Sequence, residues 1–179
     1  MADALHPDGR YSGVARGFHW VMVVLILVVL PVGVVIKYIK EDVKLSFYAI
    51  HESLGFLLLI LVLLRLAYRL FVRRPPPLPA DLPPLLQTVA HGVHWALYGL
   101  LVVQPVIGFL ATNAWGFPLK WFGVIPIPSP LGKDEPVAKI LSLIHTTIGW
   151  TILALLVVHI GGALYHHVVR KDGVLYRML

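Results

Sequence analysis

The sequence contains no cysteine among its 179 residues. This absence excludes disulfide bonds, thiolate-ligated iron–sulfur clusters and cysteine-based zinc sites, and it excludes covalent c-type haem, which needs a C-x-x-C-H motif. Charge is also scarce: Asp, Glu, Lys and Arg make up 13% of the chain, against about 25% in average soluble domains. The chain is therefore not an ordinary soluble domain, and any redox chemistry would need a non-covalent cofactor.

Hydrophobic residues, by contrast, make up 58% of the chain, and its mean hydropathy is +0.82. About 20 apolar residues span the hydrocarbon core of a bilayer, and four stretches are long enough: residues 17–37, 45–70, 90–112 and 140–167. A backbone in lipid must satisfy its own hydrogen bonds, so each span is predicted to be a helix. We predict an all-α integral membrane four-helix bundle, with residues 1–179 forming a single domain.

The net charge of +6 could indicate a nucleic-acid partner, but the basic residues flank the apolar spans. That placement is better explained by membrane topology, so we expect a lipid bilayer as partner and no nucleic acid. If the amino terminus is inside, every arginine of the chain falls on the inner side. The arginine bias predicts that both termini are cytoplasmic.

Depth along the predicted spans pairs four histidines at two levels, with His51 and His145 in the outer half and His19 and His159 toward the inside. An ionisable side chain inside a span is costly and is a functional candidate by default. His145 and His159 are separated by about 21 Å along one helix, on nearly the same face.

Two histidines on facing helices at one depth can bind a haem iron from both sides. An iron with two imidazole ligands is six-coordinate and suits electron transfer. Gly55 and Gly149, one turn from His51 and His145, would leave room for the flat macrocycle. Two alternatives stay open: hydrogen-bonded packing histidines, and a zinc site, which needs three or four close ligands.

Further polar residues lie near the predicted inner surface. His94 shares a helix face with His91, and it could contact a haem propionate or a quinone, or merely lie at the interface. His166 and His167 are candidate proton-exchanging groups, since histidine titrates near neutral pH; a polar helix end that reaches toward water is the alternative. Arg65 and Arg69 share a face and could pair with propionates.

The two halves of the chain resemble each other. Gly17-Phe18-His19-Trp20 opens the first span and Gly92-Val93-His94-Trp95 opens the third, while His51-x-x-x-Gly55 in the second matches His145-x-x-x-Gly149 in the fourth. A duplicated two-helix unit would explain this pattern. It makes His94 the counterpart of His19, and Arg65 the counterpart of His159.

Taken together, the motifs resemble the bacterial cytochrome b561 family, four-helix membrane proteins with two b-type haems, and particularly its superoxide:ubiquinone oxidoreductase (superoxide oxidase) branch. The matching motifs follow one another through nearly the whole chain: R-x-x-H-W at Arg16–Trp20, I-H-x-x-x-G at Ile50–Gly55, R-x-x-x-R at Arg65–Arg69, H-x-x-H at His91–His94, and His145, His159, His166-His167 and Lys171-Asp172.

The resemblance implies two haem b groups per chain, an inner one with the axial ligands His19 and His159 and an outer one with His51 and His145. It also implies a quinone site near the inner haem, for which His94, His166 and His167 are the candidates. Arg16, Arg65 and Arg69 are candidates for contact with the propionates. The expected location is the bacterial inner membrane, as a multi-pass protein.

The function expected from this resemblance is electron transfer from a periplasmic donor, superoxide in that branch, through two haems to ubiquinone. The chain would then be an oxidoreductase. An alternative is a cytochrome b electron-transfer or anchor subunit of a dehydrogenase or hydrogenase complex, which would dock a redox partner subunit. A third is a transporter or channel without haem, in which the histidines relay protons.

Overall fold

The computed structural model describes residues 9–79 and 81–179. These residues form four long helices, α1 (Gly13–Val35), α2 (Glu41–Ala67), α3 (Pro84–Trp115) and α4 (Glu135–Tyr165). Each helix is long and apolar enough to cross a membrane. The prediction of a mostly helical protein with four membrane-capable helices is therefore confirmed.

The helix boundaries follow from local chemistry. The Ser12 hydroxyl accepts a hydrogen bond from the Ala15 N–H and caps α1, and the Asp134 carboxylate accepts one from the Val137 N–H and caps α4. The described residues of the proline-rich linker, 73–79 and 81–83, contain no helix, and α3 begins directly after them with a proline in its first turn. At its other end α3 stops at Gly116, whose φ of +90° suits glycine.

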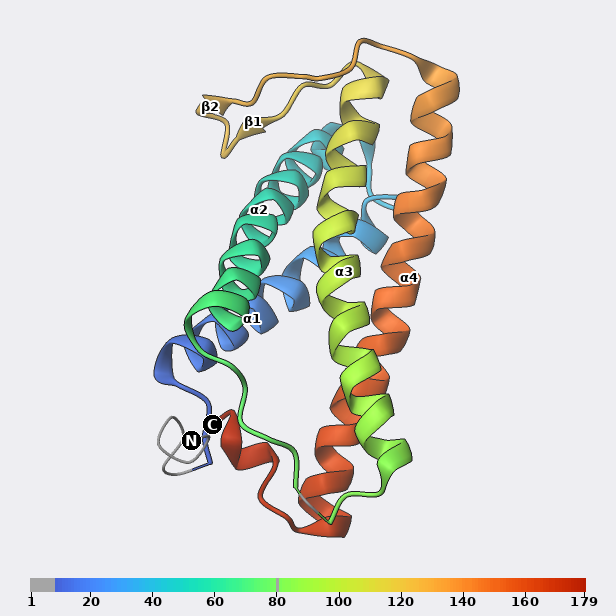
Figure 1. Cartoon of the computed structure of the whole chain (residues 1–179). Helices are drawn as coiled ribbons and strands as arrows, with labels where there is room; N and C mark the ends of the chain where they lie inside the picture. Colours follow the sequence, from blue (N-terminus) through green and yellow to red (C-terminus); the bar gives the residue numbers. More distant parts are fainter. Residues whose placement is uncertain (1–8, 80) are drawn as a thin grey trace.

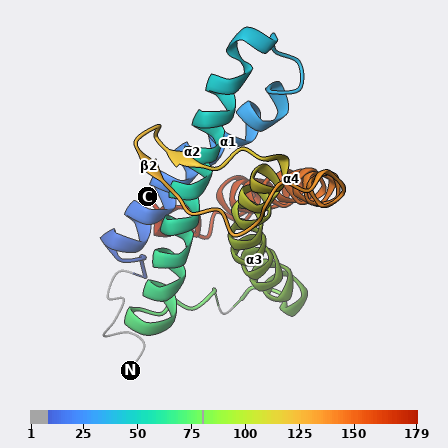
Figure 2. The same ribbon diagram turned by 90° about the horizontal axis from the view of Figure 1, so that it is seen from above.

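Helix α3 packs most extensively on α4, and α2 packs about equally on α1 and on α3. Figure 2 shows α1 and α2 beside α3 and α4 when the bundle is seen from above. Between them lies one apolar cluster to which all four helices contribute: Met22, Leu58, Val62, Tyr98, Leu101 and Ile152. Large apolar side chains elsewhere, such as Leu27 and Val157, are more than 60% exposed, at 68% and 64%, which suits lipid contact.

One end of the bundle, here called the terminal end, holds both the start and the finish of the described chain (Figure 1). The Tyr11 N–H donates to the Arg177 carbonyl at 3.0 Å, and the Trp20 indole N–H donates to the Met178 carbonyl at 2.8 Å. Two π-helical segments, Tyr68–Val72 and His166–Arg170, continue α2 and α4 at this end. The carboxyl-terminal segment is thus tied across the start of α1.

The opposite end, here called the hairpin end, carries two short antiparallel strands, β1 (Lys120–Trp121) and β2 (Ile125–Pro126) (Figure 1). Ser53, on α2, anchors this hairpin. Its hydroxyl accepts from the Phe122 N–H at 2.9 Å, and its carbonyl accepts from the Trp121 indole N–H at 3.1 Å. The sequence did not predict this hairpin, because two-residue strands carry no recognisable alternation.

Candidate functional site

Two histidines face each other toward the hairpin end of the bundle. His51 lies on α2 and His145 on α4, and their ring centres are 6.1 Å apart with the ring planes at 82°. The structure therefore brings together the two residues that were predicted to share the outer depth. They will be called the outer pair.

Both rings of the outer pair are oriented by backbone carbonyls. His51 Nδ1 lies 3.0 Å from the Val29 carbonyl oxygen, and His145 Nδ1 lies 3.0 Å from the Gln104 carbonyl oxygen. A carbonyl only accepts hydrogen bonds, so Nδ1 carries the proton in both rings. The remaining nitrogen, Nε2, is then the one that can bind a metal, which is the usual arrangement around a metal-ligating histidine.

Two glycines let the rings of the outer pair approach the neighbouring helices. A Cβ atom placed on Gly33 would lie 2.7 Å from His51 Cε1, and one on Gly108 would lie 2.7 Å from His145 Cε1. Real side chains do not approach so closely, so any residue larger than glycine at either position would require the histidine ring to move.

The same geometry recurs in both halves of the chain. Gly33 comes fourteen residues after His19, and Gly108 comes fourteen residues after His94. The residues whose carbonyls accept the hydrogen bonds, Val29 and Gln104, are also equally spaced in the sequence from these two histidines. The contacts thus reproduce the internal repeat seen in the sequence. Sequence reasoning singled out Gly55 and Gly149 and missed Gly33 and Gly108, although their equal spacing in the repeat was a usable signal.

A cavity of about 340 Å³ adjoins the outer pair. That volume lies within the range of about 300–1,000 Å³ typical of small-molecule and cofactor sites. Its lining includes both histidines and one glycine from each long helix, namely Gly33, Gly55, Gly108 and Gly149. A Cβ on Gly55 would touch no described atom within 4 Å, so this glycine borders open space, as expected if it leaves room for a flat cofactor.

Gln104 places its side-chain amide in the wall of this cavity. Its Nε2 lies 3.3 Å from His145 Nε2, and its buried Oε1 has no hydrogen-bond partner among the described residues. An unpartnered buried acceptor is costly. The outer cavity therefore offers one free polar group beside the histidine nitrogen that can bind a metal.

A second level of histidines lies toward the terminal end. The ring centres of His19 on α1 and His159 on α4 are 6.3 Å apart, with the planes at 73°. They will be called the inner pair. The His94 ring of α3 is also close, with its centre 5.0 Å from that of His159, while His94 Nδ1 donates to the Ala90 carbonyl. Three imidazoles thus meet at the inner level, where the depth argument expected two.

Arg65 contacts the inner pair directly. Its guanidinium donates to His19 Nδ1 at 3.2 Å, so this nitrogen acts as an acceptor, unlike Nδ1 in the outer pair. Arg65 also lies over the Tyr98 ring at 5.5 Å, and Arg69 lies over the Trp95 ring at 5.1 Å. Two of the predicted cationic residues are therefore held beside the inner level by stacking on aromatic rings.

The remaining predicted residues lie at the terminal end. Arg16 donates to the backbone oxygen of Leu179 and does not bond to the inner pair within the described chain. His167 packs its ring against Tyr176, with the centres 5.5 Å apart. His166 Nδ1 lies 2.6 Å from the Asp172 carboxylate. His166 and His167 sit about 10 Å or more along α4 from His159, at 1.5 Å per residue.

A small cavity of about 20 Å³ also opens at the terminal end, lined by arginines and hydroxyl groups that include Arg65, Arg69 and Tyr11. Burial raises the pKa of the Tyr11 phenol, although the nearby Arg69 and Arg65 charges oppose this effect. The phenol is therefore a neutral hydrogen-bonding group at physiological pH. The cavity presents donors and positive charge, which suits a carboxylate or another small anion.

The distances within the two pairs are compatible with one metal ion between each pair. Bonds of about 2 Å from a metal to each imidazole nitrogen place two facing ring centres about 6 Å apart. Within the described residues no group of three or more His, Asp or Glu side chains could hold a metal ion. The tetrahedral zinc alternative therefore gains no support, whereas the ring-centre distances at both levels suit a metal ion with two protein ligands.

Comparison with known proteins extends these observations. The family model described as prokaryotic cytochrome b561 matches residues 10–179. The chain is 30% identical over 178 residues to "Cytochrome b561 homolog 2" of Escherichia coli (strain K12), covering 95% of this chain and 91% of that protein. It is 27% identical over 170 residues to "Probable superoxide oxidase CybB" of Yersinia pestis, covering 95% of this chain and 96% of that protein.

Proposed function

The chain belongs to the prokaryotic cytochrome b561 family, and we propose that it moves electrons across the membrane through two b-type haems, each held by a pair of histidines. Family membership makes the protein a multi-pass oxidoreductase of the bacterial inner membrane that works in transmembrane electron transfer with b-type haem. The number of haems, their ligands, the electron donor and the electron acceptor belong to the proposal.

The observation that carries the proposal is the pair of facing histidines at each level. His51 and His145 would be the axial ligands of an outer haem, and His19 and His159 those of an inner haem. The ring-centre distances of 6.1 and 6.3 Å support this assignment. A haem iron with both axial positions filled exchanges electrons rather than binding oxygen, and two such groups at different depths would carry electrons between the membrane surfaces.

The residues around the inner level would receive the charged edge of the inner haem. Arg65 and Arg69 lie beside the pair and are proposed to bind the propionates, with Arg16 a more distant third candidate. If Arg65 binds a propionate, it releases His19 Nδ1, which can then carry the ring proton and leave Nε2 for the iron.

We propose that ubiquinone is the electron acceptor and binds at the terminal end, near His94, His166 and His167. Both termini are proposed to be cytoplasmic, so this end would face the cytoplasm, where protons for quinone reduction are available. Superoxide is proposed as the donor at the hairpin end. The similarity to the Yersinia pestis protein named as a probable superoxide oxidase supports this choice.

One surface feature favours a second candidate function, the electron-transfer subunit of a larger complex. The hairpin exposes apolar side chains, with Phe122 55% and Val124 79% exposed. Such a surface at the donor end suits a partner subunit that delivers electrons. Co-purification of a stoichiometric redox subunit from native membranes would support this alternative over an enzyme that works alone.

The test is made on the purified protein. The ratio of b-type haem to polypeptide is measured first, and two haems per chain are expected. Enzymatically generated superoxide should then reduce the haem, and a short-chain ubiquinone should reoxidise it. A folded protein without haem would overturn the proposal. If superoxide does not reduce the haem but a co-purified subunit does, that subunit is the electron donor in place of superoxide.

A further inference from the structure

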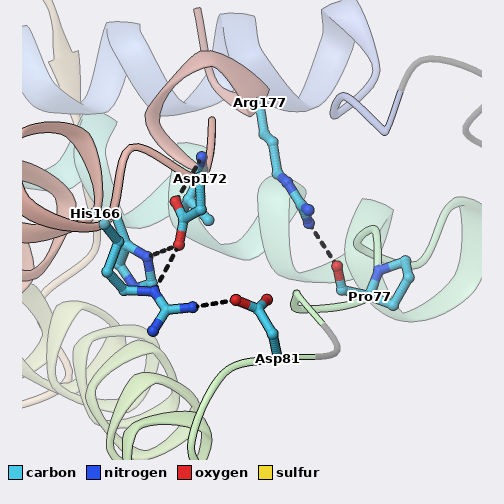
Figure 3. Close-up of polar contacts among 7 residues, drawn as sticks. Pro77, Asp81, His166, Asp172 and Arg177 are labelled. Carbon is cyan, nitrogen blue, oxygen red and sulfur yellow. Dashed lines mark hydrogen bonds and ion pairs between the residues drawn. The ribbon is translucent and has the colours of Figure 1, made fainter.

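Asp172 lies in a tight turn just beyond α4 that folds back onto the helix end (Figure 3). The turn uses two left-handed residues, Lys171 at φ +54° and Gly173 at φ +74°. It brings Asp172 Oδ2 to 2.6 Å from His166 Nδ1, with the two side chains only 11% and 13% exposed. The sequence places these residues six positions apart, and only the turn makes them partners.

Every contact to the Asp172 carboxylate comes from a hydrogen-bond donor. Arg170 Nε donates to Oδ2 at 2.9 Å, and the Val174 N–H donates to Oδ1 at 3.2 Å. Burial by itself raises the pKa of the Asp172 carboxyl, but the hydrogen bonds from His166, Arg170 and Val174 outweigh that effect and lower the pKa below its ordinary value. The carboxylate is therefore ionised at neutral pH and fixed in one orientation.

An ionised carboxylate can only accept hydrogen bonds, so the Nδ1 nitrogen of His166 must carry a proton. The proton that His166 can exchange is then the one on Nε2. Within the described residues, the charged or aromatic groups in contact with this pair are Arg170, which binds the same carboxylate oxygen, and the Tyr165 ring, whose centre lies 6.0 Å from that of His166.

We propose that Asp172 is a positioning residue for proton transfer to quinone, holding the Nδ1–H of His166 so that Nε2 supplies one of the two protons that quinone reduction consumes. This inference rests on the proposed quinone site. In the step, the Nε2–H bond breaks and an O–H bond forms on the quinone oxygen. The second proton would come from cytoplasmic water, and the donor would supply the two electrons by way of the haems. The neutral His166 keeps its hydrogen bond to Asp172 and regains the Nε2 proton from cytoplasmic water.

A purely mechanical role for Asp172 is the competing explanation. Arg170 links Asp172 to Asp81 of the proline-rich linker, with Arg170 Nη2 2.6 Å from Asp81 Oδ2, and Arg177 donates to the Pro77 carbonyl at 2.5 Å (Figure 3). These contacts tie the carboxyl-terminal segment to the linker. Asp81 takes part in these contacts but has no described contact with His166. A variant at Asp81 therefore tests the mechanical role without changing the partner of His166.

The experiment compares Asp172→Asn, Asp172→Glu and the matched control Asp81→Asn in the haem-loaded protein. Asparagine has the shape of aspartate, but its NH₂ group cannot accept the hydrogen bonds that the carboxylate accepts in the wild-type protein. We expect Asp172→Asn to lower kcat for reduction of a short-chain ubiquinone about 10- to 100-fold, the usual effect of losing a group that orients a functional histidine. The KM should change about threefold at most, and haem content and haem potentials should stay the same.

Asp172→Glu should recover part of the lost kcat, because it keeps the charge. Asp81→Asn should stay near the wild-type rate, since the Asp81 side chain is 74% exposed and exposed ion pairs contribute little. The pH dependence of kcat should change in Asp172→Asn and not in Asp81→Asn. The proposal is overturned if Asp172→Asn keeps the wild-type kcat and pH profile, or if both Asn variants lose activity equally.

A second comparison covers the case in which Asp172→Asn fails to load haem. In a His166→Gln background, the proposal requires that Asp172→Glu change kcat less than about twofold, because the partner it positions is gone. The proposal is overturned if Asp172→Glu changes kcat in the His166→Gln background as much as it does in the wild-type chain. The proposed function itself is tested on the wild-type protein. If its haems are reduced but it does not turn over quinone, the proposed quinone site does not exist.

Discussion

His51 and His145 face each other across the bundle with their ring centres 6.1 Å apart, and each ring is fixed by a carbonyl of the preceding helix in its own half of the chain. The two halves thus build one site from equivalent parts. The inner level is not symmetric, since Arg65 stands where the repeat would place the counterpart of His159, and it contacts His19 instead of facing it as a ligand. This asymmetry suggests different environments, and different potentials, for the two proposed haems.

The first prediction concerns the pairing of the ligands. Single His51→Ala and His145→Ala variants should each lose the same haem, about half of the total, while His19→Ala and His159→Ala should lose the other. Potentiometric titration of each purified variant identifies the haem that remains. If the two members of one pair removed haems of different potential, the proposed pairing would be wrong.

The second prediction concerns the close approach of Gly33 to His51. A methyl group at Gly33 would lie 2.7 Å from the imidazole, so Gly33→Ala should push the ring out of place and lower the content of the outer haem. The same holds for Gly108→Ala and His145. The matched control is Gly99→Ala, where a Cβ meets no described atom within 4 Å. This control should keep both haems and gain up to about 1 kcal/mol of helix propensity.

A third prediction concerns the hairpin. Ser53→Ala removes the hydroxyl that accepts from the Phe122 N–H, while the Trp121 bond to the Ser53 backbone persists. Losing this one hydrogen bond should destabilise the docked hairpin by about 1 kcal/mol. Amide hydrogen exchange of residues 119–127 should become faster by a few-fold. The exposed Ser46 of the same helix supplies the control, and equal exchange in the two variants would contradict the anchoring role.

The fourth prediction concerns topology and uses the absence of cysteine. A single cysteine at Phe122 on the hairpin, or at Leu179 at the terminal end, would be the one thiol in the chain. A membrane-impermeant maleimide added to intact spheroplasts should label the first variant and leave the second unlabelled until the membrane is opened. Labelling in the reverse order would invert the proposed orientation, and with it the sides assigned to donor and quinone.

The fifth prediction follows from the lowered pKa of the Asp172 carboxyl. A carboxyl whose folded-state pKa is depressed contributes stability above its unfolded-state pKa of about 3.9, and that contribution is lost as the pH falls toward the folded-state value. The carboxyl-terminal segment should therefore loosen below about pH 4. A spin label attached to a cysteine at Leu179 should become more mobile over that range.

The same label in Asp172→Asn should show no such change on acidification, because the carboxyl that titrates is gone. In Asp81→Asn the change below about pH 4 should persist, because the Asp172 contacts remain. A label whose mobility does not depend on pH in the wild-type chain would show that Asp172 does not hold this segment.

The class of the protein, its four membrane-capable helices and the two depths of its histidines can be predicted from the order of its residues alone. These properties depend only on position along the chain, because hydropathy is summed over consecutive residues and depth follows from a fixed rise per residue. They are sufficient to predict the pairing of His51 with His145 and of His19 with His159. The family resemblance followed from the order of the same motifs.

The rotation of each helix toward its neighbours, by contrast, is a property of the folded bundle. It put Gly33 and Gly108 against the outer rings, brought His94 to 5.0 Å from His159, and placed Arg65 on His19. It also joined Asp172 to His166 through a left-handed turn. Such contacts depend on the rotation and crossing angle of each helix, which are set by side-chain packing between elements and not by the period of any one of them.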